Sequence, residues 1–181
     1  MLLFLIFIYS SSSAQVLTKY DQFELKEGDL IWQNTYQCRG NKDSLHAPVV
    51  QMLKSKFYTF NVVRNEVGYN GELRHYHVDC KRYGRSYFNT PRIYCDGEWT
   101  GKFIVEINDH SYKVTVYALY YESVIKIMDY YRSEREIKGR YLDAVTKKNK
   151  TAFQKGELRN ISLMSFSLKE EFTLSKTSYI N

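Results

Sequence analysis

The chain has 181 residues, of which 44% are hydrophobic, and its formal net charge is +6. This length predicts one domain, and the apolar share is typical of a globular chain rather than of a disordered one. The modest positive charge comes without an arginine-rich run or a reader motif, so we expect no nucleic-acid partner. Tyrosine is abundant, with 17 Tyr against 2 Trp and 10 Phe. Tyrosine suits the surface of a sheet, because its ring packs against apolar neighbours while its hydroxyl stays in contact with water.

The N-terminus begins with an apolar run over residues 2–9, followed by small residues that include Ser12 and Ala14. The run is far shorter than the ~20 apolar residues that cross a bilayer. It fits the apolar region of a signal peptide, although no Lys or Arg precedes it. We expect residues 1–14 to be a cleaved signal peptide, the protein to be periplasmic or secreted, and the mature chain to have no transmembrane segment.

Residues 15–28 are expected to be a polar lead-in. Residues 29–38 then place Leu30, Trp32 and Tyr36 at alternate positions, which predicts a strand. Residues 43–57 carry apolar side chains at helical spacing, and Asp43 or Ser44 is a suitable cap. Pro48 lies inside this helix, so either the regular helix begins near His46 or one backbone hydrogen bond is lost.

Strands are predicted over residues 57–66, where Phe60, Val62 and Val63 lie, and over residues 72–81. Asn70 and Gly71 form a strong turn signal between them. Residues 82–98 read as a loop, with a short strand over residues 92–95.

A long β-hairpin is predicted over residues 102–121. Apolar and mixed side chains alternate along both arms, and Asn108 to Ser111 supply the turn. Tyr112, Val114, Val116, Ala118 and Tyr120 share one parity in the second arm. A lone hairpin is marginally stable, so it is expected to belong to a larger sheet.

The pattern over residues 123–141 is unclear. A helical stripe resumes after residue 151, which predicts an amphipathic helix that closes over the sheet. Residues 29–175 are therefore expected to form one α+β domain with a helical C-terminal extension, and residues 176–181 a frayed tail. The predicted order is β-α-β-β-β-β-α, an antiparallel sheet of about five strands with two main helices on one face.

The segments DLIWQNTYQC and GKFIVEINDHSYKVTVYALYYE carry a family resemblance. They resemble an uncharacterised domain family of exported Bacteroidetes proteins, a domain of unknown function with a TBP-like fold. Lys113 stands where that family often has Arg. The resemblance implies a curved TBP-like sheet, and it implies no activity, because a fold does not determine a function.

Three cysteines leave two alternatives open. Cys80 and Cys95 flank the irregular loop, which makes them the best pair for a disulfide in an exported protein. The alternative is three separate reduced thiols, with Cys38 and the other two packed as small apolar residues.

His75, His77 and Asp79 recur at every second position of a predicted strand, so they are expected to share one face. Imidazole and carboxylate ligands suit zinc or copper, with Asp96 or His110 as a further ligand. A nuclease would instead bring His75 or His77 together with His110 and Lys113. The simpler interpretation is a polar strand face in solvent, and we expect no cofactor.

These observations favour a non-catalytic binding or interaction domain in the bacterial cell envelope. Its contact surface is expected to be the uncovered sheet face or the loop over residues 82–98, and its partner an envelope protein or a small ligand. The alternative is a metal-dependent or nuclease-type hydrolase that uses His75, His77 and Asp79.

Overall fold

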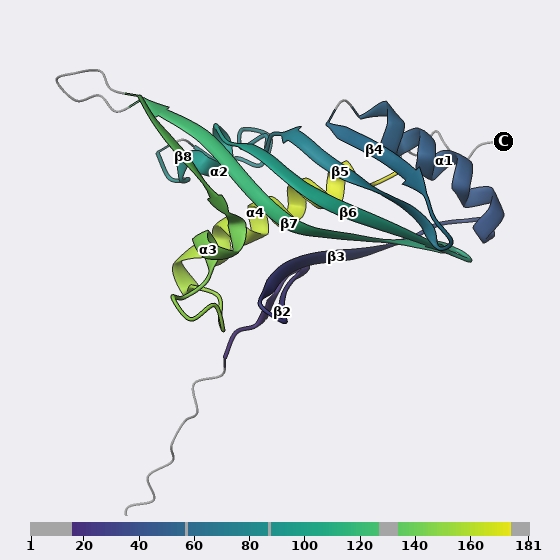
Figure 1. Cartoon of the computed structure of the whole chain (residues 1–181), viewed down its shortest axis with the longest axis horizontal. Coiled ribbons are helices and arrows are strands. Elements are labelled where there is room, and N and C mark those ends of the chain that lie inside the picture. Colours follow the sequence, from purple (N-terminus) through teal and green to yellow (C-terminus); the bar gives the residue numbers. More distant parts are fainter. Residues whose placement is uncertain (1–15, 57, 87, 127–133, 175–181) are drawn as a thin grey trace, which may run out of the picture.

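The computed structural model describes residues 16–56, 58–86, 88–126 and 134–174. Figure 1 shows these residues as an extended, twisted sheet with helices against it. The predicted signal peptide and the predicted frayed tail lie outside the described residues.

In the described part of the chain, eight strands form one antiparallel sheet in the order β1-β2-β3-β7-β6-β5-β4, and β8 also pairs with β7. The strands are β1 (Lys19–Tyr20), β2 (Phe23–Lys26), β3 (Asp29–Gln37), β4 (Thr59–Arg64), β5 (Gly68–Tyr76), β6 (Glu98–Asn108), β7 (Ser111–Lys126) and β8 (Glu134–Arg140). The helices are α1 (Lys42–Ser55), α2 (Arg92–Cys95), α3 (Tyr141–Val145) and α4 (Leu158–Glu171), with a short 3-10 turn at Lys155–Glu157.

The long strand β7 joins the two halves of the sheet. One of its edges pairs with β6 from the Asn108–Ser111 end to the Glu98–Glu122 pair. Its other edge pairs first with β3 and, further along, with β8 (Figure 1). The predicted hairpin is therefore confirmed as the centre of the sheet, since every other strand is attached to it directly or through one of these neighbours.

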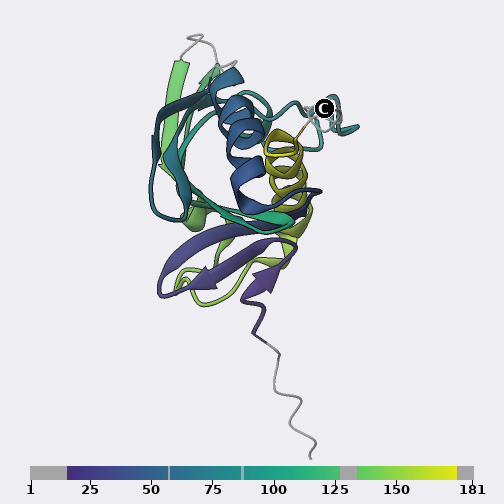
Figure 2. The same ribbon diagram turned by 90° about the vertical axis from the view of Figure 1, so that its right-hand side faces the viewer.

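Three strands carry an irregularity that adds a residue against the partner strand. The registers shift at Asn61 in β4, at His75 in β5 and at Ala118 in β7, and these three residues have φ angles of 51°, 53° and 50°. An extra residue in one strand increases the local twist and bends the ladder. Figure 2 shows the result, a sheet that curls around α1 and α4.

Helices α1 and α4 fill the concave side of this sheet. Along α4, Ile161, Met164 and Leu168 are buried, which confirms the predicted amphipathic helix. Hydroxyl and indole groups of the strands reach the helix: Trp32 Nε1 donates to Ser165 Oγ over 3.2 Å, and Tyr36 OH donates to the Lys169 carbonyl over 2.9 Å. The inner layer is thus fixed by hydrogen bonds as well as by apolar packing.

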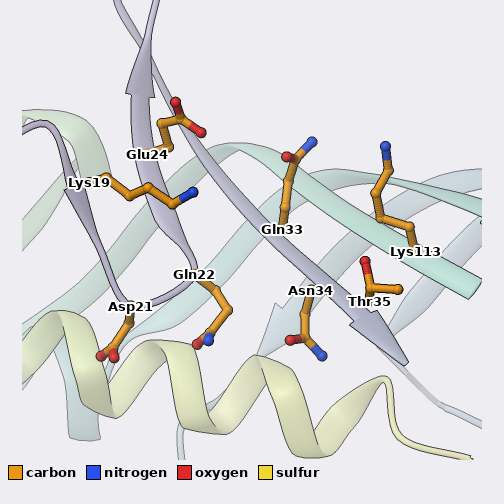
Figure 3. A pocket seen from close by; sticks show the side chains of 8 residues that line it. All are labelled: Lys19, Asp21, Gln22, Glu24, Gln33, Asn34, Thr35 and Lys113. Carbon is orange, nitrogen blue, oxygen red and sulfur yellow. The ribbon is translucent and has the colours of Figure 1, made fainter. Parts of the chain in front are cut away.

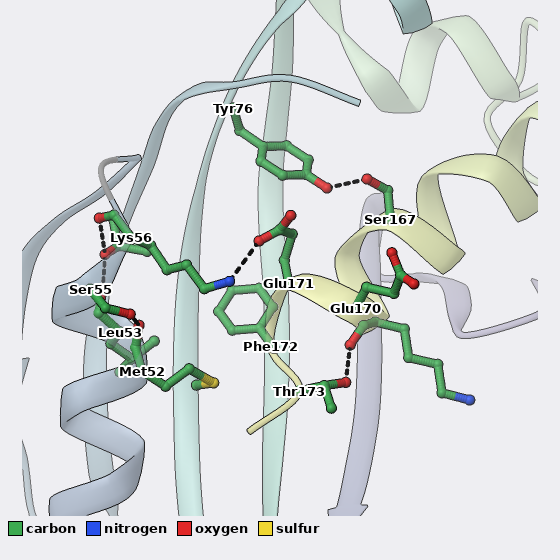
Figure 4. A network of polar contacts seen from close by, with 12 residues as sticks. Met52, Leu53, Ser55, Lys56, Tyr76, Ser167, Glu170, Glu171, Phe172 and Thr173 are labelled. Carbon is green, nitrogen blue, oxygen red and sulfur yellow. Dashed lines mark hydrogen bonds and ion pairs between the residues drawn. The ribbon is translucent and has the colours of Figure 1, made fainter. Parts of the chain in front are cut away.

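The C-terminal ends of α1 and α4 meet, as Figure 4 shows. Lys56, which caps α1, forms an ion pair of 3.0 Å with Glu171 at the end of α4. Tyr76 from β5 shares a hydrogen bond with Ser167 one turn earlier in the same helix. Both contacts hold α4 across the strands rather than along them.

The α+β class is confirmed, and the predicted order β-α-β-β-β-β-α is present as β3-α1-β4-β5-β6-β7-α4, with additional elements and with eight strands instead of about five in the described part of the chain. Residues 15–28 are not only a lead-in, because they contain β1 and β2. Residues 123–141 contain the end of β7 and all of β8. Residues 92–95 form the helix α2 instead of a strand, because Pro91 presets the backbone for a helical start and Tyr94 N donates to its carbonyl over 3.0 Å.

Helix α1 agrees with the prediction except at its start. Its cap is Asn41, whose side chain accepts a hydrogen bond from Ser44 N over 3.0 Å, rather than Asp43 or Ser44. Pro48 lies inside the helix, which begins six residues earlier at Lys42. The proline therefore removes one backbone donor, and the helix continues past it because Leu45, Val49, Met52 and Leu53 remain buried.

Candidate binding face of the sheet

The outer, convex face of the sheet is polar. Along β6, Trp99, Phe103 and Val105 point into the core and are fully buried, while Glu98 and Thr100 are exposed on the opposite side. Helices α1 and α4 both lie on the inner side (Figure 2). The outer face is therefore the broad surface on which this fold can meet a partner.

A hollow of about 360 Å³ lies on this face where β5, β6, β7 and β8 come together. We call it the tyrosine hollow, and its lining residues are His75, Glu98, Thr100, Tyr120, Tyr121, Glu122, Lys138 and Gly139.

The bulge in β7 is what turns Tyr120 outward. Val116 is fully buried, so a regular strand would bury Ala118 and Tyr120 as well. The extra residue at Ala118 reverses the alternation, so that Leu119 is 4% exposed and Tyr120 is 47% exposed. The predicted common parity of Tyr112 to Tyr120 is therefore wrong beyond Val116.

The bulge in β5 acts on His75 in the same way. Leu73 is buried, and the register shift after it lets Tyr76 point inward while His75 points to solvent. Asn, Asp and His are the non-glycine residues that best tolerate such a left-handed backbone. The two bulges face the adjacent residues Thr100 and Gly101 of β6, so they shape one site.

Charged side chains cross the hollow in a row. His75 Nδ1 lies 2.7 Å from Glu98 Oε2, and His77 Nε2 lies 3.8 Å from Glu98 Oε1. Glu98 pairs across the strands with Glu122, which in turn pairs with Lys138. The hydrogen-bonded carboxylate of Glu136, with a smaller effect of Glu122, raises the pKa of Lys138 above its ordinary value. The carboxylates are suited to cationic or hydroxyl groups of a ligand, and the phenol ring of Tyr120 offers an apolar contact.

A second hollow of about 300 Å³ lies beside β1, β2 and β3 (Figure 3). We call it the amide hollow, and it is lined by Lys19, Asp21, Gln22, Glu24, Gln33, Asn34, Thr35 and Lys113. Asp21 and Gln22 accept hydrogen bonds from Ser162 and Ser165 of α4, which fixes one wall of the hollow. Lys113 forms an ion pair of 2.5 Å with Glu106, so its charge is already balanced.

The predicted metal ligands do not all lie on one strand. Strand β5 ends at Tyr76, so His77 and Asp79 lie beyond it, and Asp79 Oδ1 accepts a hydrogen bond from Arg82 N over 3.1 Å. The residue that contacts both histidines is Glu98, which the sequence interpretation missed. Among the described residues, no group of three or more His, Cys, Asp or Glu is placed to hold a metal ion. Zinc or copper binding at His75, His77 and Asp79 stays a prediction.

The residues proposed for a nuclease are far apart. His75 lies beside Glu98 at the first residue of β6, whereas His110 lies in the turn after Asn108 at the last residue of β6. A strand of this length spans about 35 Å, so neither His110 nor Lys113 reaches the tyrosine hollow. Asp96 is the C-terminal cap of α2. No shared phosphate site arises from these residues in the described structure.

Cys80 and Cys95 form a disulfide, with their Cα atoms 5.4 Å apart. It closes the loop that precedes β6. Cys38 is a free, half-buried thiol at the end of β3. Of the two alternatives left open by the sequence, the structure contains the paired one.

Helices in the described part of the chain are all too short or too polar to span a membrane. No protein-family model matches the chain, and no curated protein matches it. Solved structures to which the chain is similar include a TBP-like protein from Parabacteroides distasonis ATCC 8503, with 12% identity over 78% of this chain and 84% of its own and a TM-score of 0.43. A DUF4468 family protein from Bacteroides ovatus ATCC 8483 has 12% identity over 86% of this chain and 93% of its own, with a TM-score of 0.44. These neighbours are of the type that the sequence resemblance names, an uncharacterised domain with a TBP-like fold, and they assign no activity to this chain.

Proposed function

We propose that the protein is an exported, non-catalytic binding domain of the bacterial cell envelope that meets its partner through the outer face of the sheet, at the tyrosine hollow. The observation that carries this proposal is the β7 bulge. Because of this bulge, Tyr120 is 47% exposed, whereas regular alternation along β7 would bury its side chain.

Exposed tyrosines are enriched in protein interfaces, because a large rigid ring is buried at low entropic cost and the hydroxyl keeps a partner. The inner face of the sheet is already used by α1 and α4. Around Tyr120, the half-exposed carboxylates of Glu98 and Glu122 are open to solvent. Such groups suit recognition of a partner that presents basic or hydroxyl groups, and they are too hydrated for the water-excluded chemistry of an active site.

Two features support export. The apolar run of residues 2–9, with Ser12 and Ala14 after it, has the form of a signal peptide. The Cys80–Cys95 disulfide is a kind of bond that persists under oxidising conditions, such as those of the periplasm or outside the cell. The partner is then an envelope protein or a small ligand of the same compartment.

The test is quantitative capture from an envelope extract with immobilised protein. We expect a partner to be retained by the wild type and by Phe166→Ala, a matched variant of the equally exposed Phe166 on α4. Tyr120→Ala should weaken capture of the same partner by about tenfold or more, as expected for an aromatic anchor. Equal capture by Tyr120→Ala and the wild type contradicts the proposed contact surface.

A further inference from the structure

The loop closed by the Cys80–Cys95 disulfide has an unusual charge. Between the two cysteines, residues 81–94 contain Lys81, Arg82, Arg85 and Arg92 and no Asp or Glu. We call its described residues, 80–86 and 88–95, the disulfide loop. It emerges between β5 and β6, at the end of the molecule where α2 lies in Figure 1.

The disulfide loop is held in shape by its own backbone. Besides the disulfide, Gly84 N donates to the Lys81 carbonyl over 3.0 Å, Arg85 N to the Cys80 carbonyl over 2.8 Å, and Asn89 N to the Ser86 carbonyl over 3.0 Å. Tyr83 OH donates to Glu170 of α4 over 2.5 Å. These bonds preorganise the loop, so little conformational entropy is lost when it binds a partner.

Phe88 stands on this loop with 98% of its surface exposed. No other apolar side chain among the described residues is as exposed, since Val16 follows at 60% and Val63 at 58%. A phenylalanine in full contact with water contributes nothing to the core and carries a free-energy cost of hydration. A large apolar ring on a preformed loop is therefore placed for an apolar environment outside the chain.

Of the four cations in the disulfide loop, only Arg82 forms an ion pair with another described residue. Arg82 forms an ion pair of 3.2 Å with Glu170, which is also the acceptor of Tyr83. Arg85 donates to the Arg159 carbonyl over 2.8 Å, and a carbonyl does not neutralise it. Lys81 and Arg92 are exposed. Asp79 and Asp96 flank the loop, and Asp79 is engaged with the Arg82 backbone.

We propose that the disulfide loop docks the protein on an anionic lipid bilayer, with Phe88 inserted at the headgroup level and Lys81, Arg85 and Arg92 against the lipid phosphates. Peripheral proteins bind such surfaces through segments that combine an exposed aromatic ring with several cations. This goes beyond the proposed function, because none of the residues that line the tyrosine hollow belongs to the disulfide loop.

A bilayer fits better than a soluble polyanion. A polyanion would be matched by the cations alone, whereas the full exposure of Phe88 requires an apolar phase for its ring. This difference defines the test. Binding to a polyanion depends on charge alone, whereas binding to a bilayer depends on charge and on Phe88.

The experiment is co-sedimentation of the protein, as recovered from expressing cells, with vesicles of phosphatidylglycerol and phosphatidylcholine or of phosphatidylcholine alone. The wild type should bind the anionic vesicles, less so as salt is raised. Lys81→Ser/Arg92→Ser should lower the partition coefficient roughly 30-fold, the effect of two basic side chains at an anionic surface. Phe88→Ser should lower it at least about tenfold. All variants share residues 2–9 with the wild type, so any contribution of that apolar run to vesicle binding is the same in each protein and does not affect the ratios of their partition coefficients.

Two control variants match these changes elsewhere on the surface. Lys147→Ser/Lys148→Ser removes the same net charge from another exposed basic cluster, and Phe166→Ser removes a half-exposed ring from α4. Both should bind as the wild type does. The proposal is overturned by equal binding to both kinds of vesicle, by equal losses in the controls, or by wild-type binding of Phe88→Ser. It is also overturned if the protein ignores vesicles yet binds an oligonucleotide through Lys81 and Arg92. Each of these outcomes leaves the partner test at Tyr120 untouched.

Discussion

His75 Nδ1 lies 2.7 Å from Oε2 of Glu98, and this contact joins the bulge of β5 to the first residue of β6. His75 points outward because its left-handed backbone reverses the alternation of β5. Ala118 does the same for Tyr120 in β7. The candidate binding face is thus a product of two bulges, and its stability depends on backbone positions as much as on side-chain contacts.

Ala118→Val tests the bulge directly. A β-branched residue is strained at a φ of 50°, so we expect the free energy of unfolding to fall by about 1–2 kcal/mol. Urea denaturation measures this change. Thr100→Val, at an exposed position of β6 outside the positive-φ positions, should change stability by no more than about 0.5 kcal/mol. Equal effects of the two substitutions would mean that the backbone of Ala118 is not in the left-handed region.

Tyr112 ties the end of α4 to the centre of the sheet. Its hydroxyl donates to the Phe172 carbonyl over 2.6 Å and accepts from Leu174 N over 3.2 Å, in buried surroundings. Tyr112→Phe should lower the free energy of unfolding by about 1–3 kcal/mol, because two buried backbone groups lose their partner. Tyr120→Phe, which alters an exposed hydroxyl, is the control and should be nearly neutral in the same denaturation experiment.

The buried tyrosines predict a loss of stability at alkaline pH. Burial, with the hydrogen bond to Glu170, raises the pKa of Tyr83 to about 12, and burial raises the pKa of Tyr36, Tyr76 and Tyr141 further still. In the unfolded chain these phenols titrate near pH ~10. Above that pH the native state binds more protons than the unfolded state, so the free energy of unfolding falls as pH rises and is unaffected by these groups below about pH 9.

The variant that checks this assignment is Tyr141→Phe. Each fully buried tyrosine adds at most about 1.4 kcal/mol per pH unit to the alkaline slope, so the slope should become shallower by about one such contribution. Urea midpoints from about pH 8 to pH 11 give the slope of both proteins. An unchanged slope in Tyr141→Phe would show that this phenol is not among the groups responsible.

Metal analysis separates the binding domain from the hydrolase alternative. We expect purified protein to contain no stoichiometric zinc or copper, and His75→Ala/His77→Ala to unfold within about 1 kcal/mol of the wild type, because exposed ion pairs contribute little. Elemental analysis and urea denaturation give both values. Stoichiometric zinc or copper that disappears in the double variant would support the hydrolase instead.

The hairpin over residues 102–121 could be predicted because apolar side chains alternate along both arms and Asn108 to Ser111 mark the turn. Strand β8 could not, since Ile137 is its one apolar residue in a run of charges. The β1–β2 hairpin was missed because both strands are short. A signal for the neighbouring β2–β3 hairpin was present at Glu27 and Gly28, which form the turn between these two strands with φ angles of 52° and 82°.

The candidate site was harder to predict than the fold. His75 and Glu98 are 23 residues apart, and no local pattern indicates that β5 and β6 are neighbours in this register. A bulge has no reliable sequence signature at Ala118, since alanine rarely adopts a positive φ. The alternation rule therefore placed Tyr120 on the parity of the buried Val116, and this result changed because of the bulge in β7. The rule also placed His75, His77 and Asp79 on one strand, whereas β5 ends at Tyr76.

The most direct test of the binding face is photo-crosslinking in the host cell, with a photoreactive phenylalanine analogue at Tyr120 or at Phe166. The two positions are similarly exposed, at 47% and 54%, and lie on the outer sheet face and on α4. The account predicts a discrete crosslinked partner from position 120 and none from position 166. Crosslinks from position 166 to the same partner, with none from position 120, would contradict it.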